Sequence, residues 1–282
     1  GPILAGRVET PGYGRSVAVS GTYVFLGQDS WGYSLQVIDV ADPAAPQIVA
    51  ALSMPAGVED VWSEDGLALL AVRGADLRIV DVSDPVAPTV VGSCATPGTA
   101  YGVAAAGAHA LVAARDQGLQ VVDISDPAQP FVAGSIDTPG LAWKVAVSGT
   151  YAYVADGSGG LQIIDVANPA APGLAATVDL PDDAFDVCVS GSVVYVAIEY
   201  HGLATVDVSD PTRPQFLGWC AVPVVPIYNV QAKGIYAYAV DSWGLSVFDV
   251  TKPVPPQVIG AVETPGTACD VAGWDNHAGI AD

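Results

Sequence analysis

Residues 35–46 are Leu-Gln-Val-Ile-Asp-Val-Ala-Asp-Pro-Ala-Ala-Pro, a short apolar run that ends in an aspartate and a proline turn. The same unit returns five more times along the chain, each turn proline following the previous one by 42 residues. These prolines are Pro43, Pro85, Pro127, Pro169, Pro211 and Pro253. Six copies in one phase indicate a repeat protein in which every copy adopts the same local structure.

Each period contains four short apolar runs separated by Gly, Pro, Asp and Ser. In the third copy these runs are residues 101–105, 110–114, 119–124 and 131–136. Their length and their content of Val, Ile, Tyr and Ala favour strands, and 22 prolines with 31 glycines leave no uninterrupted amphipathic stretch for a helix. Four strands in about 42 residues are typical of one blade of a β-propeller.

The number of blades follows from two counts. The Thr-Pro-Gly-like turn before the first strand of a copy occurs seven times, whereas the third-strand unit occurs six times. We therefore predict an all-β, single-domain propeller over residues 1–282 with seven four-stranded blades, six of them complete repeats. A composite blade closes the ring, with its outer strand from residues 1–11 (Ile3–Val8) and its two inner strands from residues 266–282. A six-bladed propeller is the alternative.

The composite blade lacks its third strand in the sequence. Aligned on the repeat, the gap corresponds to residues 115–128, which is 14 positions. We expect that either flanking residues fill this gap or a neighbouring molecule donates a strand there.

Composition excludes several classes of function. The chain has 30 acidic and 9 basic side chains, a net charge of −21, so no surface for nucleic acid or anionic membranes is expected. No run reaches the roughly 18 apolar residues of a membrane span. With 51% apolar residues, a large core is expected, and the excess is available for contacts with other molecules.

The unit at residues 35–46 and a second unit, Val-Ala-Val-Ser-Gly-Thr-Tyr-Ala-Tyr-Val-Ala-Asp at residues 145–156, resemble the LVIVD repeat family. That family is similar to bacterial and archaeal surface β-propellers. The resemblance covers essentially the whole chain, with departures such as Asn168 and Lys252 at the aspartate before the turn proline. It implies a propeller fold and an exported, extracellular or cell-surface location, and little about function.

The aspartate that ends each third strand is interpreted as structural. A carboxylate before a turn accepts backbone N–H bonds, and a residue needed six times around a ring is rarely catalytic. The set comprises Asp39, Asp81, Asp123, Asp165, Asp207 and Asp249.

Positions that vary between copies are where function is expected. One set precedes the first Val of each inner strand and is predicted to surround one mouth of the central channel: Ser16, Asp60, Gly102, Lys144, Asp186, Asn229 and Asp270. Asp60, Asp186, Asn229 and Asp270 offer oxygen ligands of the kind that Ca²⁺ prefers, which makes calcium the one candidate cofactor. Against a metal site, Lys144 belongs to the same set.

The second variable set lies in the loops between the second and third strands, which are expected to share one face. Aromatic and Arg side chains there are typical of binding interfaces. Packing of the Trp residues over blade edges is the competing interpretation. The candidates are Asp29, Trp31, Arg73, Arg115, Asp156, Tyr200, His201 and Trp243.

Motifs of catalysis are few. The sequence contains no Gly-x-Ser-x-Gly, His-Glu-x-x-His or phosphate-binding glycine loop. The leading hypothesis is a non-enzymatic module for binding or self-assembly, as a fibre or surface lattice, whose partner is another copy or another surface protein. The alternatives are an enzyme or metal-binding protein that uses the channel mouth, and carbohydrate or protein recognition by the loop aromatics.

The four cysteines are expected to be free thiols.

Overall fold

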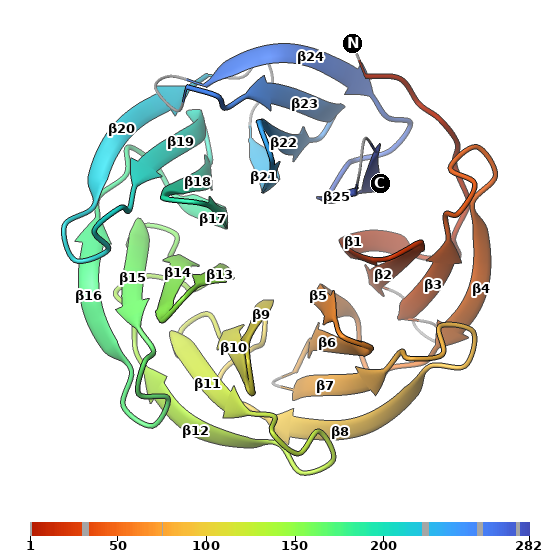
Figure 1. Ribbon diagram of the computed structural model, residues 1–282, viewed down its shortest axis with the longest axis horizontal. Coiled ribbons are helices and arrows are strands. Elements are labelled where there is room, and N and C mark those ends of the chain that lie inside the picture. Colours follow the sequence, from red (N-terminus) through yellow and green to blue (C-terminus); the bar gives the residue numbers. More distant parts are fainter. Residues whose placement is uncertain (1, 30–33, 75, 222–225, 253–255, 275–276) are drawn as a thin grey trace.

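The computed structural model describes residues 2–29, 34–74, 76–221, 226–252, 256–274 and 277–282. Within these ranges every regular element is a β-strand, and no helix of the length and hydropathy needed to cross a membrane is found. The strands form a closed ring of twisted sheets around a central axis (Figure 1).

Six sheets have four antiparallel strands each, in chain order from the axis outward. Blade 1 contains β1 (Tyr13–Ser20), β2 (Tyr23–Asp29), β3 (Leu35–Asp39) and β4 (Gln47–Leu52). Blade 2 contains β5 (Val58–Glu64), β6 (Leu67–Val72), β7 (Asp76–Asp81) and β8 (Thr89–Ala95). Blade 3 contains β9 (Gly102–Ala106), β10 (His109–Ala113), β11 (Leu119–Asp123) and β12 (Phe131–Ile136).

Blade 4 contains β13 (Lys144–Ser148), β14 (Tyr151–Ala155), β15 (Leu161–Asp165) and β16 (Gly173–Val178). Blade 5 contains β17 (Ala184–Ser190), β18 (Val193–Ile198), β19 (Gly202–Asp207) and β20 (Gln215–Cys220). Blade 6 contains β21 (Ile227–Lys233), β22 (Tyr236–Asp241), β23 (Gly244–Asp249) and β24 (Gln257–Glu263). The strands expected from the repeat in blade 3 agree with the structure to within one residue at each end.

The structure thus has six four-stranded blades, the number that the alternative prediction gives. The predicted seventh, composite blade is not confirmed, because β25 (Asp270–Trp274) and β26 (His277–Ala281) form a sheet of only two strands. This hairpin lies between blade 6 and blade 1, near the axis (Figure 1). Residues 2–12, which contain the predicted outer strand Ile3–Val8, run along the circumference without strand pairing. An outer strand bonds to a third strand, and none lies between this segment and β26 among the described residues.

The apolar core lies between neighbouring blades. Seven clusters of buried side chains each join two adjacent sheets. Phe25 of blade 1, for example, belongs to a cluster with Val61 and Leu70 of blade 2. Ala272 and Ala281 of the hairpin pack with Val17 and Val24 of blade 1, which joins the two ends of the chain. Contacts between blades therefore account for most of the high apolar content.

The six aspartates at the ends of the third strands adopt one arrangement. The Oδ1 atom of each accepts the backbone N–H of the second residue after it, at 2.8–2.9 Å. Where that second residue is Ser or Thr, its hydroxyl also donates a hydrogen bond to the carboxylate. The hydroxyl and N–H bonds together lower the pKa of Asp81, Asp123 and Asp249. These residues hold the turns at the face opposite the start of the inner strands.

Candidate functional site

The residues that precede the first Val of each inner strand, here called the axial ring, connect consecutive blades. Asp60 Oδ2 accepts the N–H of Val103 at 2.8 Å, and Asp186 Oδ2 accepts that of Val230 at 2.6 Å. Asp270 Oδ2 accepts the N–H of Val17 at 2.7 Å, a bond between residues near opposite ends of the sequence. Each of these carboxylates is thus bound to the innermost strand of the next sheet, and Asp270 closes the ring.

Ser16 and Lys144 complete this network. Ser16 Oγ accepts the N–H of Val61 at 3.0 Å and donates to Asp60 Oδ1 at 2.8 Å. Lys144 Nζ reaches the same Oδ1 at 2.5 Å, although the two residues belong to blades 4 and 2. Burial alone lowers the pKa of Lys144, but the charges of Asp60, Asp270 and Asp186 outweigh burial and raise it. Lys144 is therefore charged at neutral pH.

The carboxyl groups of Asp186 and Asp270 bind protons unusually tightly. Burial raises the pKa of Asp186 to about 7 and that of Asp270 to about 6, while attraction to Lys144 opposes both shifts. The ordinary value of an aspartate in an unfolded chain is about 3.9. The folded state therefore binds these two protons more strongly than the unfolded state does. The stabilisation from this proton binding is complete below about pH 4 and is lost as the pH rises to about 7.

We therefore expect the chain to melt at a higher temperature at pH 5 than at pH 8, with part of that difference removed in Asp186→Asn. The amide carries no charge at either pH, so this variant loses the titration while an amide oxygen can still accept the Val230 N–H. Thermal melts followed by circular dichroism test this, with the exposed Asp116→Asn as the matched control for general charge. An equal pH dependence in Asp186→Asn and Asp116→Asn would contradict the assignment.

Carboxylate oxygens of the predicted calcium ligands contact other groups of the protein. Ca²⁺ takes six to eight oxygen ligands. In the ring, one oxygen of each carboxylate faces a backbone N–H of the next blade, and Asp60 also faces Lys144. Within the described ranges, no group of three or more His, Cys, Asp or Glu side chains is placed to hold a metal ion. Asn229, the fourth predicted ligand, is buried in the ring as well.

A second ring of side chains was not predicted from the sequence. It comprises the residue immediately before each axial-ring residue, and we call it the mouth ring: Arg15, Glu59, Tyr101, Trp143, Phe185, Tyr228 and Cys269. In blades 1, 2, 5 and 6 this residue is the extra residue of a β-bulge in the pairing of the first two strands. A bulge turns a side chain out of the regular alternation. The 42-residue repeat could have revealed this ring, because its members recur with the same spacing as the axial ring and each lies one residue earlier in the sequence.

Aromatic side chains occupy one arc of the mouth ring. Trp143 lies edge-on between Tyr101, at 5.0 Å between ring centroids, and Phe185, at 6.0 Å. The guanidinium of Arg115 lies 4.5 Å from the Trp143 ring centroid and 5.0 Å from that of Tyr101, within cation–π range. Arg115 is one of two described non-glycine residues with a positive φ, 50°, and the corresponding residue of blade 4 is Gly157. The strained backbone and the aromatic contacts together fix the position of this guanidinium.

The opposite arc carries charge. Arg73 contacts both oxygens of Asp29 at 3.1–3.2 Å and also bonds Glu59, whose side chain is nearly buried. Arg15 approaches the same two carboxylates at 3.5 and 3.9 Å. Two arginines and two acids from blades 1 and 2 therefore form one network at the channel mouth, and the predicted residues Asp29 and Arg73 belong to it.

The remaining loop candidates are not gathered in one place. Asp156 is fully buried and bonds Thr138 Oγ1 at 2.5 Å and the N–H of Gly140 at 2.9 Å, so it holds its own loop together. His201 lies 3.4 Å from Asp182 and edge-on to Trp219. Tyr200 and Trp243 are 63% and 62% exposed on blades 5 and 6. Trp31 lies outside the described residues.

Comparison with known proteins assigns the repeat. The model of the LVIVD repeat matches residues 11–52, 57–96, 97–138, 139–180, 181–222 and 228–264. The chain belongs to the LVIVD repeat family. Each of the six matched LVIVD repeats includes one four-stranded blade, or nearly all of one, so the resemblance seen in the sequence is confirmed. No curated protein matches the chain.

Many solved structures resemble this LVIVD repeat protein, at low sequence identity. The chain is similar to a computationally designed protein, Ika8, with a TM-score of 0.71, 11% identity, and 99% of this chain and 84% of that chain covered. It is also similar to the β-propeller domain of Cps50 (Swd1) from Myceliophteria thermophila, with a TM-score of 0.73, 15% identity, and 93% and 90% covered. A protein from Lactobacillus plantarum gives 0.76, 12% identity, and 91% and 86% covered. These likenesses show the fold alone.

Proposed function

We propose that this LVIVD repeat protein is a non-enzymatic binding module that acts at the cell surface or outside the cell. Its ligand is a protein, either another surface component or a second copy of the chain, and the binding face is the one that carries the mouth ring. The aromatic arc with Arg115 on it supports this proposal most directly. Trp, Tyr and Arg are enriched among the few residues that contribute most of the binding energy in protein interfaces.

The chemistry of the axial ring supports a binding role over catalysis. The acids closest to the channel axis accept backbone N–H bonds and an ion pair, so their oxygens are engaged in holding blades together. Exposed groups on the same face include Tyr200, Trp243 and the arginines of the mouth ring network. Large aromatic surfaces with fixed cations favour recognition of a partner's side chains.

Site-specific photo-crosslinking tests the binding face. A photoreactive phenylalanine analogue in place of Trp243 is expected to capture a discrete protein on intact cells of the source organism. The same analogue in place of Val86, which is 56% exposed in a turn on the opposite face, is the matched control. Equal capture at both positions, or none at Trp243, would refute the proposal. Absence of the chain from the cell exterior in surface labelling would refute the location.

Arg115→Gly provides a second test that leaves the fold intact. Because glycine adopts a positive φ without strain, this variant is expected to keep or slightly raise the melting temperature, by an amount equivalent to about 1 kcal/mol or less. It also removes the guanidinium from Trp143, so crosslinking at Trp243 is expected to fall. Arg213→Gly, in a turn of the opposite face, serves as the control. Unchanged crosslinking in Arg115→Gly would contradict a role for the aromatic arc.

Carbohydrate is the second candidate ligand, favoured by the exposure of Tyr200 and Trp243. Sugar rings stack on such aromatic faces. Saturable quenching of tryptophan fluorescence by one class of oligosaccharide, lost in Trp243→Ala, would support carbohydrate in place of protein.

A further inference from the structure

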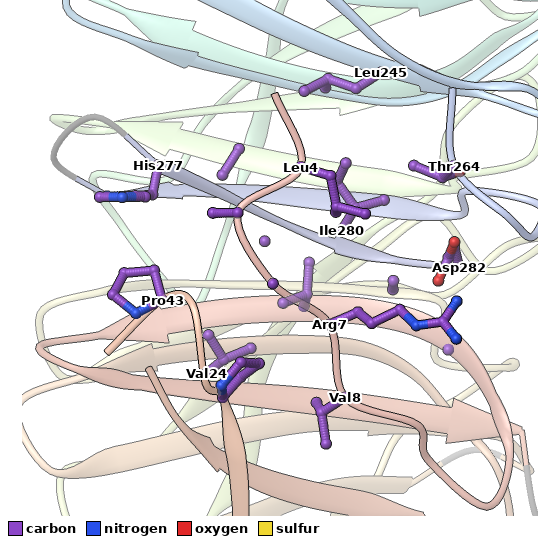
Figure 2. Close-up of a pocket in the computed structure, with 18 of the residues that line it drawn as sticks. Leu4, Arg7, Val8, Val24, Pro43, Leu245, Thr264, His277, Ile280 and Asp282 are labelled. Carbon is purple, nitrogen blue, oxygen red and sulfur yellow. The ribbon is translucent and has the colours of Figure 1, made fainter. Parts of the chain in front are cut away.

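A cavity of about 840 Å³ lies beside the β25–β26 hairpin. Figure 2 shows Val24 of blade 1 on one side and Leu245 of blade 6 on the other, with His277 and Ile280 of β26 between them. Residues 2–10 form part of the lining as well. The cavity therefore lies between β26 and the segment before β1, and no mouth ring residue belongs to its lining.

The segment before β1 occupies the place of an outer strand. In the outer strands β8 and β12, Gly92 and Gly134 pack so closely on the next blade that a Cβ would overlap the carbonyl oxygens of Pro127 and Pro169. Gly6, at the equivalent repeat position, makes the same approach to the carbonyl of Pro43 in blade 1. Gln28 Nε2 holds the segment further, by donating to Thr10 Oγ1 at 2.7 Å and to the carbonyl of Gly12 at 2.9 Å.

The hairpin occupies the place of the two inner strands. Asp282 accepts the N–H of Gly266, as Asp156 accepts that of Gly140 at the equivalent positions of blade 4. The Cys269 N–H bonds the carbonyl of Ala281, so this carbonyl points toward the β25 side. Along an antiparallel strand, the N–H and C=O groups of successive residues point alternately to the two neighbouring positions. Since the C=O group of Ala281 points toward β25, the N–H and C=O groups of Ala278 and Ile280 point to the outer edge of β26.

This outer edge lacks the strand that every complete blade has. β14 pairs with β13 on one side and β15 on the other, and its Ala152 and Val154 are fully buried. In β26 the equivalent Ala278 and Ile280 are partly exposed, and β25 is the only paired strand within the described ranges. The position of the third strand is thus bordered on both sides, and none of the described residues occupies it.

We propose that this slot binds an extended peptide segment with the pattern of the chain's own third strands, adding it as a β-strand between β26 and residues 2–10. The six equivalent slots identify this occupant, because each holds a strand of the pattern Leu-x-x-apolar-Asp. The residue before the apolar one is itself apolar in five of the six and is Thr205 in the sixth. Backbone bonds to Ala278 and Ile280 give affinity, and apolar side chains enter the cavity. This site is separate from the mouth ring, so either proposal can fail alone.

The probe is a synthetic peptide with the sequence of residues 161–172, Leu-Gln-Ile-Ile-Asp-Val-Ala-Asn-Pro-Ala-Ala-Pro. With the 282-residue chain it is expected to show saturable one-to-one binding in calorimetry and to slow hydrogen exchange at residues 277–281. The matched control peptide carries Leu161→Asp and Ile163→Asp and is expected to bind at least about tenfold more weakly. Absence of saturable binding, or protection confined to the mouth ring, would overturn the proposal.

A variant of the chain tests the edge directly. Proline lacks an N–H and is tolerated on a free strand edge, so Ala278→Pro is expected to lose peptide binding by at least about tenfold. Ala278→Gly keeps the N–H and is expected to bind as the unmodified chain does. If Ala278→Pro fails to fold, the two peptides still decide the matter. Equal binding of both peptides to the unmodified chain would show that strand pattern plays no part.

Discussion

Lys144→Met is expected to lower the free energy of unfolding by about 3–5 kcal/mol at neutral pH, because it leaves buried carboxylates without their cation. The Lys144 ammonium lies 2.5 Å from Asp60 Oδ1 and also offsets the charges of Asp186 and Asp270. Methionine keeps much of the length and apolar stem of the lysine, so lost packing contributes little. Urea unfolding followed by tryptophan fluorescence measures the change.

Two further measurements separate charge from packing in this variant. Adding Asp60→Asn to Lys144→Met removes the negative charge nearest the lysine and is expected to recover part of the loss. Lowering the pH to 5 is expected to reduce the loss too, since Asp186 and Asp270 then hold protons. A loss that is unchanged by pH and by Asp60→Asn would mean that the lysine acts through packing alone.

Phe248→Ala is expected to cost about 3–5 kcal/mol, through lost burial and the cavity left behind. Phe248, on β23, is fully buried in the cluster that joins blades 5 and 6, with Tyr195 and Leu203 as neighbours across the interface. Chemical unfolding gives the free energy. Phe131→Ala removes the same ring from a position that is 56% exposed and is expected to change stability little. Similar losses in the two variants would contradict a core located between blades.

The repeat predicted the strands and the turns because both depend on local chemistry. Alternating apolar residues, the proline turn and the terminal aspartate specify a strand and its end within a few residues. The period also placed the segment around Gly6 at the outer edge and residues 270–281 near the axis. It did not show that residues 2–12 would remain unpaired, since pairing depends on a neighbouring strand and not on the residues of the segment itself.

The candidate site was harder to predict, for two physical reasons. The extra residue of a bulge turns Phe185 and Tyr228 toward the channel mouth, and a bulge leaves no signature in residue type. The chemistry of the axial acids depended on the next blade: Asp60 and Asp270 face backbone N–H groups about 42 residues away or at the other end of the chain. These backbone N–H partners are brought next to the carboxylates only when the blades pack into the ring.

The bond from Asp270 to Val17 and the short hairpin have a mechanical consequence. Force applied between the two ends of the chain would load the junction of β25 and β26 with blade 1 first. Six blades resist such force with four paired strands each, whereas this junction has a two-stranded sheet, one small apolar cluster and the axial bond. Among the junctions that the described residues form, this one is therefore the weakest, and we expect the ring to open there under tension while the four-stranded blades remain folded.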